Sequence, residues 1–129
     1  MAMSHLTANT DPKNSNKMED FEKRWKPIED MLTARFGKKP NMEAILFLIG
    51  INELNNLKTK YSKEQKQDLM HVAVCTLLSQ SGYFELEGYD ADGWPHFKEL
   101  QPVPKFNLEE QEHFLKEHII TYFSEHEED

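Results

Sequence analysis

Hydrophobic side chains in residues 18–36 recur every three or four positions, which is the repeat of one face of an α-helix. Pro27 interrupts this pattern and has no backbone N–H, so we expect either a kink at this residue or a helix that begins near it. Gly37 suits the position just after a helix, which predicts that the first helix ends at Phe36. The hydrophobic face consists of Phe21, Trp25, Ile28, Met31, Leu32 and Phe36.

The next two segments predict two further helices. Asn41 can cap a helix that runs to about Leu57 and is apolar on nearly every side at its start, which is typical of a central, buried helix. Gly50 within it lowers the helix propensity by about 1 kcal/mol, so we expect a close crossing with another helix as compensation. Ser62, with a glutamine three residues later, forms the sequence of a capping box and predicts a third helix that ends at Gly82.

The repeat then changes to the alternation of a β-hairpin. Residues 83–89 and 94–100 flank the segment Asp90-Ala91-Asp92-Gly93, whose Asp-Gly pair suits the positive φ angles of a tight turn. A four-residue loop would place Tyr89 opposite Trp94. The alternation predicts that one face of the hairpin points to the core and carries Phe84, Leu86 and Phe97. The other face, partly in water, carries Tyr83, Glu85, Glu87, Tyr89, Trp94, His96 and Lys98.

Two prolines, Pro102 and Pro104, end the second strand, and Asn107 with Glu110 predicts the capped start of a fourth helix. The pattern as a whole predicts a mainly α fold, a compact domain of four helices with a β-hairpin inserted between the third and fourth helices. The apolar stripe of the fourth helix consists of Leu108, Leu115, Ile119, Tyr122 and Phe123.

The composition fits one domain with a hydrophobic core. The chain has 129 residues, of which 38% are hydrophobic and 29% are charged, and a domain usually has about 100–200 residues. We therefore expect residues 18–124 to form a single globular domain, between a flexible N-terminal tail of residues 1–17 and an acidic C-terminal tail of residues 125–129.

Three features of the sequence indicate the cellular compartment, and together they favour a cytoplasmic protein. Cys75 is the only cysteine, so no disulfide can form within the chain. Residues 1–17 lack the hydrophobic stretch of a signal peptide. The longest apolar stretch, residues 44–51, is far shorter than the roughly 20 residues that span a bilayer, so we expect no association with a membrane.

The formal net charge of -8 is unevenly distributed along the chain. Residues 1–66 hold 12 basic and 9 acidic side chains, a net charge of +3, whereas residues 67–129 hold 3 basic and 14 acidic side chains, a net charge of -11. Such polarity can hold the two halves together, orient a partner or pair two copies of the chain.

An enzyme or metal site at His71 and Cys75 is the first alternative considered. Asp68, His71 and Cys75 share one side of the third helix, like an orienter, a base and a nucleophile. However, a reactive cysteine usually lies at a helix N-terminus or near a cation, and mid-helix amides cannot form an oxyanion hole. A metal would need further ligands from His113 or His118, without any recognisable spacing. We therefore predict no catalytic site, no metal and no cofactor, with Cys75 in the core and His71 paired with Asp68.

A nucleic-acid-binding regulator is the second alternative, because three helices followed by a hairpin is also the order of a winged-helix domain. Phosphates could be held at the start of the third helix by the lysines Lys58, Lys60, Lys63 and Lys66. The predicted hairpin, however, carries four carboxylates that would repel phosphate, and a solvated connector explains the lysines more simply. We therefore do not favour a nucleic-acid partner.

The hairpin's wet face is the preferred candidate site. It carries the aromatic and imidazole side chains of Tyr83, Tyr89, Trp94 and His96, and tyrosine and tryptophan are enriched at the hot spots of protein interfaces. These side chains predict a small interaction or adaptor module whose partner is another protein or a second copy of this chain, and an exposed hairpin edge can also accept a strand. The first or fourth helix could instead cover this face, and the sequence leaves both possibilities open.

Overall fold

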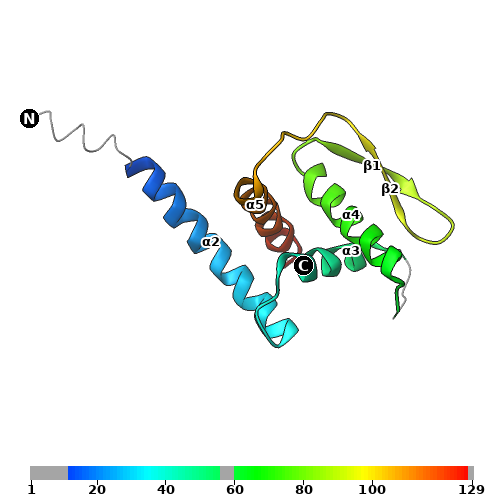
Figure 1. Ribbon diagram of the computed structural model, residues 1–129, viewed down its shortest axis with the longest axis horizontal. Coiled ribbons are helices and arrows are strands. Elements are labelled where there is room, and N and C mark those ends of the chain that lie inside the picture. The colour runs from blue at the N-terminus through cyan, green and yellow to red at the C-terminus, as the bar shows by residue number, and fades with distance from the viewer. Residues whose placement is uncertain (1–11, 56–59, 128–129) are drawn as a thin grey trace, which may run out of the picture.

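The computed structural model describes residues 12–55 and 60–127, which fold into four helices and one antiparallel β-hairpin (Figure 1). The mainly α fold and the position of the hairpin between the third and fourth helices are as predicted. The elements are α2 (Pro12–Phe36), α3 (Met42–Glu53), α4 (Lys63–Ser79), β1 (Phe84–Tyr89), β2 (Pro95–Glu99) and α5 (Leu108–Glu127).

Both terminal helices are longer than predicted. α2 begins at Pro12, so residues 12–17, which were expected in the N-terminal tail, are helical. A proline suits the first helical turn, where its missing N–H has no partner to lose. The helix continues through Pro27 and does not begin there. α5 extends to Glu127, so residues 125–127 are helical as well.

Side-chain caps start three of the helices at the predicted residues. Asn41 Oδ1 accepts a hydrogen bond of 2.9 Å from the Ala44 N–H and caps α3. The predicted capping boxes of α4 and α5 are both formed. Each cap side chain accepts a hydrogen bond from the backbone N–H three residues on, and the side chain of that later residue accepts one from the backbone N–H of the cap. The two pairs are Ser62 with Gln65, and Asn107 with Glu110.

The crossing of α3 and α4 depends on Gly50. A Cβ atom at this position would overlap the carbonyl oxygen of Leu69, so the two helices pack backbone against backbone. The predicted close crossing is confirmed. α3 ends at Glu53, and Leu57, its predicted end, lies outside the described residues.

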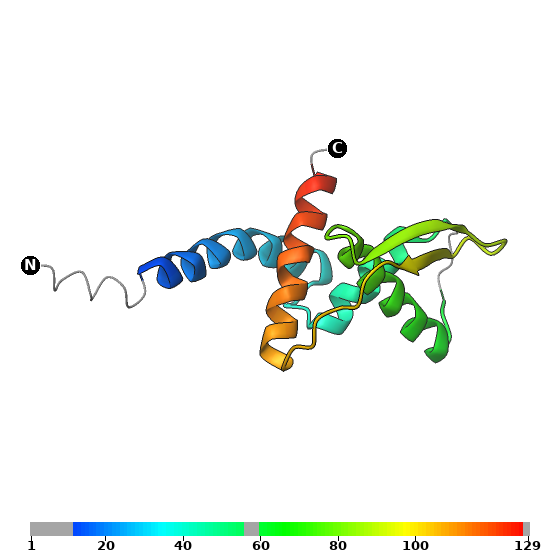
Figure 2. The same ribbon diagram turned by 90° about the horizontal axis from the view of Figure 1, so that it is seen from above.

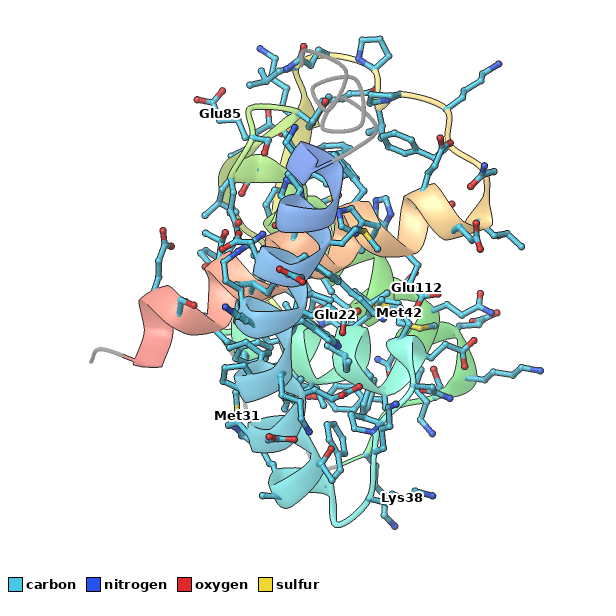
Figure 3. All side chains as sticks on the ribbon, turned by 90° about the vertical axis from the view of Figure 1, so that its left-hand side faces the viewer. Glu22, Met31, Lys38, Met42, Glu85 and Glu112 are labelled. Atoms are coloured by element: carbon cyan, nitrogen blue, oxygen red, sulfur yellow. The ribbon has the colours of Figure 1, made fainter. Side chains whose placement is uncertain are left out.

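The core lies where α2, α3, α4 and α5 meet, and α5 crosses behind α2 when the molecule is seen from the α2 side (Figures 2 and 3). Arg24 Nη1 of α2 donates to Glu117 Oε1 of α5 at 2.8 Å, and the Tyr122 hydroxyl donates to Glu53 Oε2 of α3 at 2.6 Å. The buried side chains of the core are Phe21, Trp25, Ile28, Leu32, Ile45, Leu46, Ile49, Ala73, Leu77, Leu115, Ile119, Ile120, Tyr122 and Phe123.

The hairpin lies beside α4, on the side away from α2 (Figure 1). Leu86 pairs with Phe97, which is the register that a four-residue loop gives. A β-bulge between Leu86 and Gly88 then shifts the register, so Tyr89 pairs with Pro95 and the predicted pairing of Tyr89 with Trp94 is wrong. Leu86 is 45% exposed, which also corrects its prediction as a core residue.

Candidate functional site

A groove of about 700 Å³ separates α4 from the hairpin. The helix lines it with Gln65, Asp68, His71, Val72 and Cys75. The hairpin lines it with Phe84, Asp90, Asp92, Trp94, Pro95, His96, Phe97 and Glu99. The turn of the hairpin is tied to the end of α3, because the Asn55 N–H donates to the Gly93 carbonyl oxygen at 2.8 Å. The hairpin wall of the groove is therefore anchored at its turn to the segment that follows α3.

Asp90 organises the turn that carries Trp94. One carboxylate oxygen accepts hydrogen bonds from the N–H groups of Asp92 and Trp94, at 2.9 and 3.0 Å. The other lies 2.9 Å from His96 Nε2. The bond to His96, followed by the bond from the Trp94 N–H, lowers the pKa of Asp90 below its ordinary value. The predicted Asp-Gly turn is confirmed, with Gly93 at φ 85°, and it holds Trp94 at the rim of the groove.

Cys75 forms part of the groove floor and is only 1% exposed. Burial, with a smaller contribution from the negative charge of Glu99, raises the pKa of the Cys75 thiol to about 11. The thiol is therefore protonated at neutral pH, the opposite of an activated nucleophile. The prediction that Cys75 is buried is confirmed. His71 Nε2 lies 3.6 Å from the Cys75 sulfur, and within the described residues no hydrogen bond joins His71 to Asp68, so the predicted pairing is wrong.

The two histidines considered as further metal ligands lie elsewhere. His118 is buried, with Nδ1 at 2.8 Å from the Phe114 carbonyl oxygen and Nε2 at 2.7 Å from the Ser81 hydroxyl. The ring of His113 packs on Phe21 of α2, on the other side of the core. Within residues 12–55 and 60–127, no three His, Cys, Asp or Glu side chains are grouped so that they could hold a metal ion.

The four predicted partner-binding residues do not share one face. Tyr83 packs edge-on against Phe114 of α5, with ring centroids 6.1 Å apart, so the fourth helix covers this residue. Tyr89 is 45% exposed at the end of β1. Trp94 and His96 come together at the groove. The bulge explains much of the difference, because it breaks the alternation on which the predicted face depended.

Several groove residues were not predicted as site residues, and Glu99 and Phe97 are the clearest. The alternation of Pro95, Phe97 and Glu99 along β2 is the sequence signal that points all three to one side. On α4, the shared side of Asp68, His71 and Cys75 was recognised, and that side does line the groove. The sequence did not indicate that this side of α4 and this side of β2 face each other across the groove.

Among the residues that the structure describes, four carboxylates and no lysine or arginine line the groove. Asp68 and Glu99 form no ion pair with any residue that the structure describes. The lysines considered as an anion site do not enter it. Lys60, Lys63 and Lys66 are exposed around the start of α4, and Lys58 lies outside the described residues.

Comparison with models of protein families, with curated proteins and with solved structures found no match for this chain. In the part of the chain that the structure describes, none of the helices has the length and apolar character needed to cross a bilayer.

Proposed function

We propose that this protein is a protein-interaction module that binds a partner protein in the groove between α4 and the hairpin. The observation that carries the proposal is a hollow of about 700 Å³ lined by Trp94, by polar side chains and by the buried Val72, Cys75 and Pro95, because binding sites are concave and combine apolar side chains with polar groups that orient the partner. Tryptophan is also a frequent anchor of protein interfaces. The site differs from the predicted hairpin face but retains Trp94 and His96.

Preorganisation supports this choice of site. The Asp90 hydrogen bonds and the bond from Asn55 to Gly93 fix the turn before any partner arrives. A rigid wall loses little conformational entropy on binding, so more of the contact energy remains as affinity.

The protonated thiol of Cys75 on the groove floor favours binding over catalysis. Cys75 is the nucleophilic side chain of the groove, and its raised pKa keeps the thiol neutral. Binding of nucleic acid is disfavoured, because a phosphate backbone beside α4 would meet the carboxylates of Asp68 and the turn. We place the interaction in the cytoplasm, where a chain with a single, buried cysteine needs no oxidising environment.

A site-specific photo-crosslink tests the proposal. His71 is exposed, lines the groove and can be replaced by benzoylphenylalanine in the native host. Gln67 is exposed on the same helix but does not line the groove, and it serves as the matched control position. Light is expected to produce a discrete adduct with the same partner protein, identified by mass spectrometry, at position 71 and not at position 67. An absence of adducts at position 71, or the same adducts at both positions, would overturn the proposal.

A further inference from the structure

Within residues 12–55 and 60–127, no strand lies beside the outer edge of β2. The sheet has two strands, so each pairs along one edge within the described residues. The Leu100 N–H donates to the Tyr83 carbonyl oxygen, and the Asp90 N–H donates to the Trp94 carbonyl oxygen. Successive residues of a strand direct their backbone N–H and C=O groups to opposite edges, so these two bonds show that the even-numbered residues of β2 face β1. The N–H and C=O groups of Phe97 and Glu99 therefore point outward, where another strand could pair with them.

β2 borders the groove more than β1 does. Side chains of Pro95, Phe97 and Glu99 line it, whereas β1 contributes Phe84 alone. A chain that lay beside β2 would thus have the groove on one of its faces. Alternate side chains of an extended chain point to the same face, about 7 Å apart, so every second residue of such a chain would enter the groove.

The charge of the groove selects the chemistry of those residues. Asp68 on α4 and Glu99 on β2 stand on opposite walls, without ion-pair partners among the described residues. The charge of Glu99 also contributes to the raised pKa of Cys75, so its negative potential reaches the floor. Cationic side chains would be attracted to these walls, and anionic ones would be repelled.

We propose that the partner presents an extended segment with lysine or arginine at alternate positions, which pairs with the outer edge of β2 as a third strand and directs its cationic side chains toward Asp68 and Glu99. This inference rests on the proposed function, because it names the partner of the same groove. β-Strand addition is a common mode of peptide recognition, in which backbone bonds give affinity and side-chain sites give specificity.

A second copy of the chain fits this groove less well. Its densest described basic positions, Lys23, Arg24 and Lys26, lie within α2, and Lys63 and Lys66 lie within α4. A helical segment has its backbone groups bonded internally and cannot pair with a strand. The occupant is therefore expected to be a different protein.

Peptide binding to the intact protein tests the inference. The probe is a fluorescein-labelled peptide of alternating lysine and valine, measured by fluorescence anisotropy at low ionic strength. We expect a peptide of alternating glutamate and valine to bind at least about tenfold more weakly, and the lysine peptide to weaken steeply with salt. Two further lysine peptides are N-methylated, one at every odd residue and one at every even residue, so each keeps its charge but loses half of its backbone donors. One of the two is expected to bind about fivefold more weakly or worse, because only one set of N–H groups faces β2.

Variants of the protein locate the binding. The double variant Asp68→Asn with Glu99→Gln is expected to weaken binding of the lysine peptide about tenfold. Glu85→Gln is the matched control, because Glu85 is an exposed glutamate on the neighbouring strand that does not line the groove. It is expected to change binding less than about twofold.

Several results would overturn the inference. Equal binding of the lysine and glutamate peptides would contradict the charge argument. Unchanged affinity of both N-methylated peptides would contradict strand pairing. Spermidine that competes as well as the peptide would indicate a simple cation site. A dimer in sedimentation that the double variant abolishes would make a second copy the occupant. A groove-specific crosslink at position 71 without binding of the lysine peptide would overturn this inference and leave the proposed function intact.

Discussion

Where α2 packs on α5, Arg24, Glu117 and Lys116 each lie against a partner of opposite charge, whereas two carboxylates in the groove beside the hairpin have no ion pair among the described residues. Arg24 bonds both Asp20 and Glu117 at 2.8 Å, and the Lys116 ammonium group lies 5.0 Å from the centre of the Trp25 ring. The tryptophan there is buried. Asp68 and Glu99 have no ion pair among the described residues, and Trp94 is partly exposed.

The difference indicates which region is complete within the single chain. The contact between α2 and α5 has its apolar face covered and its charges neutralised, which is what stability requires. The groove leaves Trp94 partly exposed and two carboxylates without an ion pair among the described residues, so a bound partner could add contacts there that the single chain lacks. Four substitutions test this difference between the two regions, and the change in stability expected of them decreases from the first to the last.

Leu32→Ala in α2 should have the largest effect. Leu32 is fully buried in the core, so loss of its side chain leaves a cavity and should lower the free energy of unfolding by about 2–5 kcal/mol. Urea denaturation followed by circular dichroism measures this change. Ala34→Gly, at an exposed position of the same helix, is the control for backbone effects and should cost about 1 kcal/mol. Equal losses would show that the α2 contact is not a packed core.

Gly50→Ala should be destabilising by about 1–3 kcal/mol, because the added methyl group overlaps the Leu69 carbonyl and forces α3 and α4 apart. The sign of the effect is informative. At an open helical position the same change would stabilise the protein by up to about 1 kcal/mol. A higher melting temperature for this variant would contradict the close crossing of α3 and α4.

Glu117→Gln should lower stability by less than about 1 kcal/mol at neutral pH, because the ion pair with Arg24 is more than one-third exposed. The bond from Arg24 lowers the pKa of Glu117 below its ordinary value of 4.5. The pair therefore contributes fully above this value, and its contribution is lost as pH falls through the lowered pKa of the folded state. Denaturation of both proteins across this range should show the difference disappear in acid. A difference that persists there would point to packing rather than charge.

Glu99→Gln should have the smallest effect, within about 0.5 kcal/mol of zero or slightly stabilising, because this carboxylate has no ion-pair partner among the described residues and lies near others of the same sign. Thermal melts at low ionic strength measure it. A loss of stability as large as that of Glu117→Gln would show that the groove carboxylate supports the fold, and the comparison would no longer hold.

The features predicted correctly from the sequence are those set by near neighbours. Caps at Asn41, Ser62 and Asn107 involve residues three positions away, and the Asp-Gly turn is equally local. Gly50 also predicted the helix crossing, because a glycine inside a buried helix lowers stability unless it lets a second backbone pack closely. The sequence did not predict that α2 begins at Pro12, because residues 13–17 are polar and show no helical repeat of hydrophobic positions.

The candidate site was predicted only in part, for a different physical reason. The bulge in β1 adds one residue to a strand, and no residue pattern marked its place. It moved Tyr89 out of the predicted pair and left Trp94 at the groove. The groove itself depends on how the hairpin settles over α4, a long-range contact that periodicity does not contain. For that reason Trp94 and His96 were selected without Phe97 and Glu99.

The two tryptophans provide the most direct test of the claim that the groove, and not the α2 side, receives the cationic segment of the partner. Trp25→Phe leaves Trp94 as the single tryptophan, and Trp94→Phe leaves Trp25. Titration with the lysine-valine peptide is expected to shift the emission of Trp94 to shorter wavelength and protect it from acrylamide, while Trp25 stays unchanged. An unchanged Trp94, or an equal response from Trp25, would contradict the account.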